Sequence, residues 1–418
     1  MFAAIVSVWA LLVGISLLMM GSGLQGSLLG VRASVEDFSA LMTGVVMSSY
    51  YAGFVLGSVV TPRLISRVGH IRVFGALASI ASAIALMHAV FVEPIVWSAL
   101  RVLTGFCYIG LFIVAESWIN DRSTNENRGQ LLSIYMMVMT GAMATGPLLL
   151  NLGRTTGYDL FILASVLVSV GLVPVALTTY SAPKFEEQER FSLRKLYSIS
   201  PLGVAGALIN GATAGALVWL AAVYGRSIGM DIEDISIFTA ASIVGGTILV
   251  WPIGRLSDRY DRRLILTGVA LVGGVSASIA AIAIAPSPVA QMCAVAVVGG
   301  LTMPLYSLAV AHTNDHLQPK QMVAASSGLL LANGIGGMAG PAIAGGAMQF
   351  LGPAGYFWFP AAAIFALGGF ALFRMTRSAA VPSEEQRDFV QLPRTSGISA
   401  RLALRNQMDR DIAQMSRR

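Results

Sequence analysis

The chain of 418 residues is too apolar for a protein whose whole surface faces water. Hydrophobic residues make up 56% of it, charged residues 11%, and the mean hydropathy is +0.73. A soluble domain carries roughly 25% charged residues. The net charge of +6 does not indicate nucleic-acid binding, because the basic residues lie in short loops and a tail beside apolar segments. The two cysteines, Cys107 and Cys293, have no metal-ligand spacing and are expected to be buried small hydrophobes.

Apolar segments long enough to cross a bilayer recur along the whole chain. A spanning helix needs about 20 such residues, and only helices and closed barrels can span a membrane. The first segment lacks the basic start and the cleavage site of a signal peptide, so we interpret it as a spanning helix. The sequence predicts an all-α integral membrane protein with twelve transmembrane helices. Their approximate ranges are 4–29, 39–61, 73–92, 95–118, 130–152, 159–180, 201–225, 236–254, 264–285, 289–313, 322–350 and 354–375.

The basic residues of the loops predict the orientation. One side, here called the basic side, receives fourteen: Arg63, Arg67, Arg72, Arg122, Arg128, Lys184, Arg190, Arg194, Lys195, Arg255, Arg259, Arg262, Arg263 and Lys320. The other side receives three, Arg32, Arg154 and Arg226. Because cytoplasmic loops are enriched in Lys and Arg, we expect both termini on the cytoplasmic side of a bacterial inner membrane.

The chain divides into two similar halves. Residues 1–180 and 201–376 each hold six predicted helices, joined by a charged linker over 181–200 and followed by an Arg-rich cytoplasmic tail over 377–418. An offset of 194 residues pairs Gly105, Asn120, Asp121, Gly146 and Pro147 with Gly299, Asn314, Asp315, Gly340 and Pro341, and an offset of 192 pairs Arg63 and Arg67 with Arg255 and Arg259. Six helices repeated in parallel are a transporter architecture. In the tail, a short amphipathic helix and disorder are both open.

Three motifs carry a family resemblance. The loop GRLSDRYDRR, from Gly254 to Arg263, resembles the loop signature of the major facilitator superfamily, and PRLISRVGHIR, from Pro62 to Arg72, resembles a degenerate copy with Ser66 in place of Asp. Arg101 with Gly105 resembles a signature of proton-coupled members, and the Gly-Pro pairs Gly146-Pro147 and Gly340-Pro341 resemble the bent-helix signature of drug antiporters. The stretch 115–137 is similar to YcaD-like members. The resemblance covers residues 1–376 and implies twelve helices in the fold of that superfamily.

The loop residues are expected to form a cytoplasmic gate. A carboxylate at a helix end can accept hydrogen bonds from a neighbouring helix start, and the resemblance implies that Asp258 does so against the other half. Glu116 and Asp121 can pair with Arg63, Arg67 or Arg128, and such pairs would set the balance between conformations. In the other interpretation the arginines only enforce topology. The expected gate residues are Arg63, Arg67, Glu116, Asp121, Arg128, Gly254, Asp258, Arg259, Arg262 and Arg263.

Arg101 is the foremost substrate-binding hypothesis. A charge at the centre of a spanning helix costs roughly 2.5–3.5 kcal/mol on insertion scales, so it normally faces a cavity or a partner. Gln25 lies at similar depth, and the two could hold a carboxylate, a phosphate or another polar group. Snorkelling or a structural hydrogen bond is the alternative. Further expected cavity residues are Tyr108, Asn210, Trp219, Tyr306 and Asn333.

The glycines and prolines have structural interpretations. Gly53 with Gly57 and Gly211 with Gly215 are expected to let helices approach closely. The proline of each Gly-Pro pair would bend its helix, either for a rocking motion or only to shape the bundle.

The sequence predicts a secondary transporter of a small organic solute by alternating access. We favour export or antiport, with two alternatives: organic-anion uptake or facilitation through Arg101, and a non-transporting sensor or scaffold. No acidic residue lies deep in a spanning segment, so a proton is a candidate coupling ion only by resemblance, with Glu116 as its candidate carrier. No nucleotide-binding loop or catalytic cluster occurs, so we expect no enzyme activity, cofactor or metal. The expected partners are the solute and the lipid bilayer, without nucleic acid, and we expect a monomer.

Overall fold

The computed structural model describes residues 2–124, 127–177, 192–283, 287–318 and 321–377, and in the tail 382, 386–387, 389–391, 395–396, 398 and 403–404; side chains are described from residue 8 onward. The secondary structure of these residues is helical. The elements are α1 (Phe2–Val35), α2 (Ala40–Val68), α3 (His70–Val90), α4 (Pro94–Arg122), α5 (Arg128–Leu148), η1 (Leu149–Leu152), α6 (Asp159–Ala176), α7 (Leu193–Ile199), α8 (Pro201–Trp219), α9 (Ala221–Ser227), α10 (Ile232–Ile248), α11 (Val250–Ser257), α12 (Arg262–Ile282), α13 (Pro288–Thr302), α14 (Pro304–Asn314), α15 (Met322–Leu351) and α16 (Gly355–Met375).

Twelve spans among the described residues are long and apolar enough to cross a membrane, which confirms the predicted number. Two of them are interrupted: α10 and α11 form one span, and α13 and α14 form another, broken next to Pro304. A proline removes a backbone donor and disturbs the preceding turn. The first span runs to Val35 rather than ending at residue 29. Between the halves, α7 is a short helix within the predicted linker, and residues 178–191 lie outside the described part.

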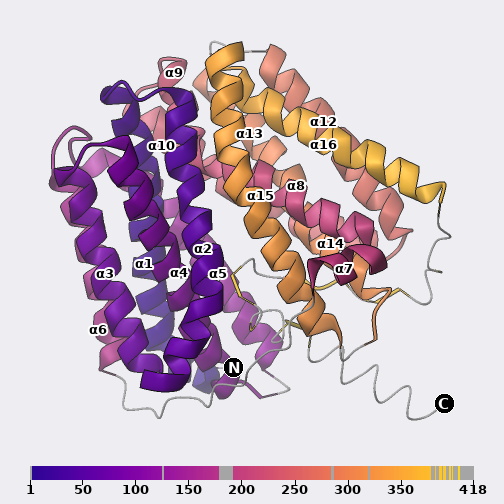
Figure 1. The fold of residues 1–418 in the computed structure, drawn as a ribbon, viewed down its shortest axis with the longest axis horizontal. Coiled ribbons are helices and arrows are strands. Elements are labelled where there is room, and N and C mark those ends of the chain that lie inside the picture. Colours follow the sequence, from indigo (N-terminus) through magenta and orange to yellow (C-terminus); the bar gives the residue numbers. More distant parts are fainter. Residues whose placement is uncertain are drawn as a thin grey trace.

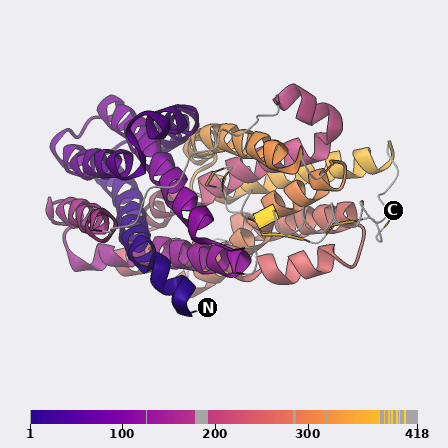
Figure 2. The same cartoon turned by 90° about the horizontal axis from the view of Figure 1, so that it is seen from below.

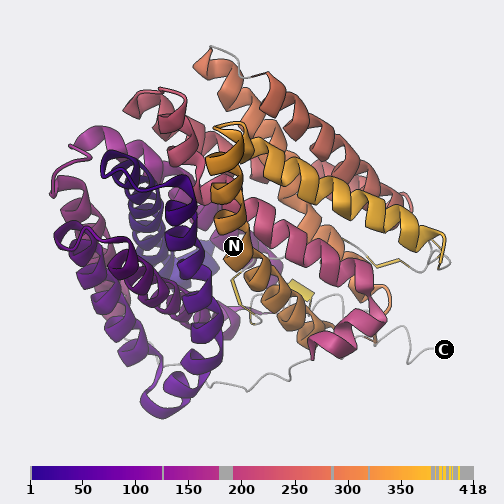
Figure 3. The same cartoon turned by 45° about the horizontal axis from the view of Figure 1, so that its top comes forward.

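The spans form two bundles that lie side by side. Figure 1 shows α1 to α6 in one bundle and α8, α12, α14, α15 and α16 in the other, while α10 lies beside the first bundle in this view. The views from below and from a tilt show the same division (Figures 2 and 3). The bundles join through α2 with α15, α5 with α10, and α1 with α9.

The halves meet at the end away from the basic side. Near the start of α2, Gly44 packs against Pro341 of α15, and Gly345 packs against Ala40. Gly30 of α1 packs against Ala222 of α9. On the basic side, described tail residues lie between the bundles, as Figure 1 shows for the yellow segments. The molecule is therefore closed at one end and separated at the other.

Small residues allow the closest helix contacts inside each half. A Cβ on Gly53 of α2 would lie 1.7 Å from the carbonyl oxygen of Val102 on α4, and one on Gly211 of α8 would lie 1.9 Å from that of Asn333 on α15. This confirms the close approach that the sequence predicted for these positions. Cys107 is buried as expected, whereas Cys293 is exposed on the outer surface of α13.

Candidate functional site

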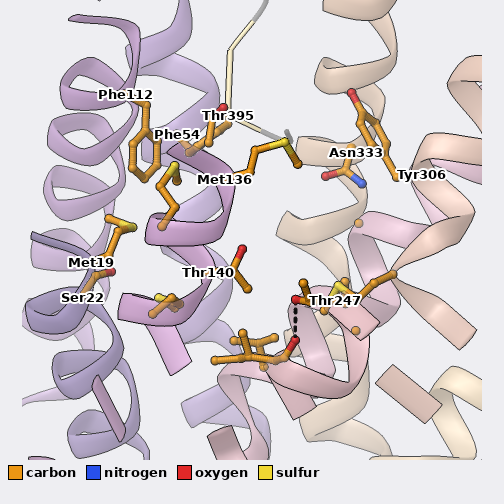
Figure 4. Close-up of a pocket in the computed structure, with 18 of the residues that line it drawn as sticks. Met19, Ser22, Phe54, Phe112, Met136, Thr140, Thr247, Tyr306, Asn333 and Thr395 are labelled. Atoms are coloured by element: carbon orange, nitrogen blue, oxygen red, sulfur yellow. Dashed lines mark hydrogen bonds between the residues drawn. The ribbon is translucent and has the colours of Figure 1, made fainter. Parts of the chain in front are cut away.

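A cavity of about 280 Å³ lies between the two halves. The first half contributes α1, α2, α4 and α5 to its wall, and the second contributes α8, α10, α11, α14 and α15. Two tail residues, Gln391 and Thr395, also line it. Figure 4 shows Met19, Ser22, Phe112, Met136 and Thr140 on one side and Thr247, Tyr306 and Asn333 on the other, with Thr395 reaching the cavity from a segment between the two sets of helices.

The wall of the first half is rich in methionine. Met136, Met139 and Met143 line the cavity from α5, and Met19 joins them from α1. The i, i+3, i+7 spacing places the three on one helical face. Methionine is unbranched and polarisable, so such a surface can adapt to apolar ligands of different shape. Sequence analysis missed this face, although its spacing was visible in the sequence.

The polar groups of the wall are neutral. Thr140 and Thr247 line it from opposite halves, and Asn333 lines it from α15. The side-chain amide of Asn333 donates to Asn210 Oδ1 and to the carbonyl oxygen of Ala207, both at 3.0 Å. Asn210 in turn donates to the carbonyl oxygen of Thr302, beside the break between α13 and α14, at 2.7 Å. Buried amides require such partners, so Asn210 stabilises the interrupted helix rather than facing the cavity.

An aromatic layer separates Arg101 from the cavity. Tyr50, Tyr51 and Trp219 line the wall, and Trp219 Nε1 donates to the Tyr51 hydroxyl at 3.2 Å. The Arg101 guanidinium carbon lies 4.7 Å from the ring centroids of both Tyr50 and Trp219. Arg101 is 1% exposed, and its Nε and Nη2 have no hydrogen-bond partner among the described residues. The Arg101 guanidinium is thus held by the rings of Tyr50 and Trp219. Its Nε and Nη2 donors lie behind these rings and do not reach the cavity.

The seven predicted cavity residues fall into two groups. Trp219, Tyr306 and Asn333 line the cavity. The other four, Gln25, Arg101, Tyr108 and Asn210, are buried behind the wall. Gln25 lies 3.4 Å from His88 Nδ1, and the Tyr108 hydroxyl donates to the carbonyl oxygen of Leu18 at 3.2 Å. The sequence did not show which of the seven side chains would point into the cavity.

The gate residues of the second half form a buried ion network. Arg262 is 1% exposed and donates to both oxygens of Asp315 at 3.0 Å and to Asp258 at 3.4 Å. Burial raises the pKa of Asp315, which lies just outside the span, while Arg262 opposes that rise. Asp258 also accepts a hydrogen bond from the backbone of Phe389 in the tail, so it binds Arg262 of its own half and the tail, and its expected contact with the other half stays a prediction.

Two neighbours complete this loop. Arg263 is paired with Asp261 at 3.0 Å. Burial alone would raise the pKa of Asp261, but the hydrogen bonds from Arg263 outweigh it and hold this pKa below its ordinary value. Arg259 is exposed. Gly254 is buried against the ring of Phe389, where a Cβ would come within 2.4 Å.

The gate residues of the first half are divided between exposed and buried positions. Arg63 and Arg67 are exposed and make no ion pair among the described residues. Asp121 lies 4.0 Å from its neighbour Arg122 and is 43% exposed. Arg128 is buried and donates to Ser123 at 3.1 Å.

Glu116 has an environment that sequence analysis did not predict. Its side chain is fully buried and accepts hydrogen bonds from Tyr135 and from the tail hydroxyls of Thr395 and Ser396. The sequence predicts the tail only as a cytoplasmic appendage. Thr395 and Ser396, which are 279 and 280 positions from Glu116 in the sequence, thus both bind its carboxylate.

The Gly-Pro pairs lie where helices cross. Gly146 packs against Gly23 of α1, and Gly340 packs against Ala212 of α8. Pro147 is followed by the 3-10 turn η1, while Pro341 lies inside α15, where the next amide, of Ala342, donates to Ser48 of the other half at 3.0 Å. The pairs support close packing, and the hypothesis of a rocking hinge stays a prediction.

Comparison with known proteins agrees with this architecture. A family model described as Major Facilitator Superfamily matches residues 11–222 and again residues 202–408. The chain belongs to the major facilitator superfamily. The two matches show that the family pattern occurs once in each half of the chain, and the predicted resemblance is confirmed.

Relatives and solved structures of the same family extend this result. The chain is 28% identical, over 82% of its length and 89% of theirs, to transporters described as "Uncharacterized MFS-type transporter YcaD" from Escherichia fergusonii and from Escherichia coli O6:K15:H31. In fold it is similar to a mutant of the nucleoside transporter NupG (TM-score 0.73, 15% identity, 88% of this chain and 98% of that one). It is also similar to a bacterial homologue of the human lysosomal transporter Spinster, in an inward-facing and occupied conformation (TM-score 0.71, 16% identity, 90% and 98%). At these identities the solved structures establish the shared fold.

The fold and the family define what the cavity can do. Members of the superfamily carry small molecules across membranes, and a cavity between two halves is where such a carrier holds its solute. Among the described residues no group of His, Cys, Asp or Glu is arranged to hold a metal ion. The chain is a multi-pass membrane transporter.

Proposed function

We propose that the protein is a secondary carrier that exports a small, largely apolar solute, neutral or anionic, by alternating access. In this proposal residues 1–180 and 201–376 move as two bodies within a bacterial inner membrane, with both termini in the cytoplasm and a proton as candidate coupling ion. The protein acts as a monomer. The single observation that carries the proposal is the cavity of about 280 Å³ between the halves.

The chemistry of the wall supports this class of solute. Five methionines and an aromatic layer provide apolar contact, while Thr140, Thr247 and Asn333 offer neutral hydrogen-bonding groups. A pocket of this kind, mostly apolar with a few placed polar groups, is typical of small-molecule sites. A cation would find no carboxylate among the described wall residues, which disfavours cationic drugs.

Arg101 favours a second candidate, an organic-anion carrier. Its two unpartnered nitrogens could bind a carboxylate if the rings of Tyr50 and Trp219 separated. Such a solute would insert its anionic end between the rings and leave its apolar part against the methionines. The same cavity would then serve uptake or facilitated movement of an anion.

A ligand screen tests the cavity against many classes of solute at once. Purified protein is screened by thermal shift against a library of metabolites and drugs, because a ligand at about 100 times its Kd stabilises the folded state by about 2.7 kcal/mol. The test variant is Trp219→Ala, on the cavity wall, and the matched control is Trp9→Ala, whose side chain is 56% exposed on the outer surface.

The outcomes separate the candidates. We expect apolar neutral or anionic hits whose stabilisation is lost in Trp219→Ala and kept in Trp9→Ala. Hits that are anions and that also lose binding in Arg101→Lys favour the anion carrier. If Trp219→Ala and Trp9→Ala respond alike, the cavity is not the binding site. Each hit is then tested for counterflow in proteoliposomes, which measures transport itself.

A further inference from the structure

The described residues of the tail occupy the mouth of the cavity on the basic side. Gln391 and Thr395 line the cavity together with residues of both halves. Thr395 and Ser396 are 7% and 5% exposed, and Leu404 is 1% exposed. A solvent-exposed tail without contacts to the bundles would not bury two hydroxyl side chains and a leucine to this extent. These residues therefore form part of the packed structure.

The first attachment is to the ion network of the second half. The backbone amide of Arg387 donates to Asp315 at 3.1 Å, and that of Phe389 donates to Asp258 at 2.6 Å. Arg262 donates to the carbonyl oxygen of Arg387 at 2.6 Å. The tail backbone thus uses both carboxylates of the network and its arginine. Hydrogen bonds to charged groups are about twice as strong as neutral ones.

The second attachment is to the first half. The hydroxyls of Thr395 and Ser396 donate to the two carboxylate oxygens of Glu116, one each. The Glu116 carboxylate is fully buried, and the Tyr135 hydroxyl also donates to it, at 3.3 Å. A buried charge needs several hydrogen bonds, so the tail contributes to the solvation of Glu116.

Apolar contacts connect the tail to both halves. Phe389 packs against Gly254 beside α11. Leu404 is buried in a cluster with Leu196, Tyr306 and Met322 of the second half, and Ile398 packs against the main hydrophobic core, which contains residues of both halves. The tail therefore crosses the gap between the bundles.

We propose that the cytoplasmic mouth is a docking site for the described residues of the chain's own C-terminal segment (386–387, 389–391, 395–396, 398 and 403–404), and that the docked segment is a plug that inhibits transport. The halves cannot close on the basic side while the segment lies between them, and a solute cannot enter from that side past it. Release of Thr395 and Ser396 from Glu116 opens the path. The inhibitory part of this proposal rests on the proposed transport function, whereas the docking does not.

Cysteine labelling tests the docking directly in the reconstituted full chain. In a background with Cys107→Ser and Cys293→Ser, the rate of reaction with a water-soluble maleimide is compared for Ser396→Cys and Thr376→Cys. Thr376 is exposed at the end of α16. We expect Ser396→Cys to react about ten-fold or more slowly, because reaction requires local release of the segment. Equal rates at the two positions would overturn the docking.

The plug is tested by a reporter inside the cavity. Thr140→Cys lies on the cavity wall, and Thr395→Glu places a carboxylate against Glu116 so that like charges expel the segment. We expect Thr140→Cys to be labelled about ten-fold faster when Thr395→Glu is added, since a hydrogen bond to a charged group is lost and repulsion replaces it. The matched control, Thr376→Glu, adds the same charge outside the mouth and should leave the rate unchanged. If Thr395→Glu and Thr376→Glu give the same rate, the segment does not block the cavity.

Transport then decides whether docking inhibits. A chain that ends at Arg377 is the second variant, in case Thr395→Glu disturbs folding. For any solute carried in the counterflow assay, both variants should raise the initial rate several-fold. If labelling shows release and the rate does not rise, the inhibition is wrong while the docking stands. If no solute is carried by any variant, the proposed function fails, and the labelling result still decides the docking.

Discussion

The two halves have the same helical architecture but different charged residues at equivalent positions of the repeat. Offset positions in the repeat place His70 and Asp121 of the first half where the second half has Arg262 and Asp315. The second-half pair is a buried ion pair at 3.0 Å, whereas Asp121 is 43% exposed and 4.0 Å from its own neighbour Arg122. The first half also has a buried arginine, Arg101, deep in α4, at the position where the second half has the apolar Val295.

The two halves therefore differ in where their charged side chains lie. The charged network lies at the basic-side mouth of one half, where it can bind backbone groups of the tail. The buried arginine lies behind the closed end of the cavity in the other half. The repeat keeps the glycine packing positions Gly105 and Gly299, while the buried polar side chains differ between the two copies.

The largest effect is expected when the second-half ion pair is broken. In Arg262→Gln the buried Asp315 carboxylate loses its counter-charge, and breaking a buried pair in this way costs about 3–5 kcal/mol. The offset-equivalent change His70→Gln should cost only about 1 kcal/mol, because Asp121, the offset equivalent of Asp315, is 43% exposed and keeps its solvation. Thermal unfolding of both variants, followed by tryptophan fluorescence, measures the difference. Equal losses would show that the halves do not differ in this respect.

The glycine contacts between helices should be more alike in the two halves than the charged residues are. A Cβ on Gly105 would lie 1.9 Å from the carbonyl oxygen of Tyr50, and one on its repeat partner Gly299 would lie 2.6 Å from that of Ser242. Gly105→Ala and Gly299→Ala should each destabilise by about 1–3 kcal/mol, with Gly105→Ala the worse of the two. Gly268→Ala, where nothing lies within 4 Å, is the control. An unaltered melting temperature in Gly105→Ala would contradict the close contact of α4 with α2.

The second half has an exposed cation–π contact that can be compared with the buried contacts of Arg101 in the first half. Arg255 stacks on Trp251 with 3.9 Å between the guanidinium carbon and the ring centroid, and Trp251 is 63% exposed. Arg101→Lys should cost about 1–2 kcal/mol, since it disturbs two desolvated cation–π contacts, whereas Arg255→Lys should cost less than about 0.5 kcal/mol. The melting temperatures of the two variants provide the test. If Arg255→Lys lowers the melting temperature more than Arg101→Lys does, the packing of Tyr50 and Trp219 does not depend on the planar shape of the Arg101 guanidinium.

A pH series sharpens the first prediction. Burial raises the pKa of Asp315, and Arg262 opposes that rise, so the pKa should be higher still in Arg262→Gln. A folded-state pKa above the unfolded value favours folding at low pH, and that contribution is lost as the pH rises through the folded pKa. Arg262→Gln should therefore regain stability on acidification, by about 1.4 kcal/mol for each unit of pKa difference.

The charged groups that face Asp315 are Arg262 on α12, His316 next to it in sequence and Arg387 of the tail. The double variant Arg262→Gln with Asp315→Asn removes the titrating group and is the control. Its stability relative to wild type should vary less with pH than that of Arg262→Gln alone. A recovery that persists in the double variant would assign the effect to another group.

Sequence analysis predicted the fold because the strongest signals are local. Twelve apolar runs, the repeat of Gly105 and Gly299, and the loop around Asp258 were visible without coordinates. The position of Arg101 within a spanning segment was visible too, and the cost of a charge in a membrane predicted that it faces a cavity or a partner. The spacing of Met136, Met139 and Met143 was also present in the sequence, but nothing there showed that this face pointed inward.

The rest could not be predicted, for a physical reason. Lipid and protein interior are both apolar, so a spanning helix does not show in its composition which face it turns toward the cavity. The sequence by itself determined the number of spans, the pseudo-repeat and the family. Only the tertiary structure decided that Arg101 lies behind Tyr50 and Trp219, and that the hydroxyls of Thr395 and Ser396 reach Glu116, because both depend on rotations and contacts between segments far apart in the chain.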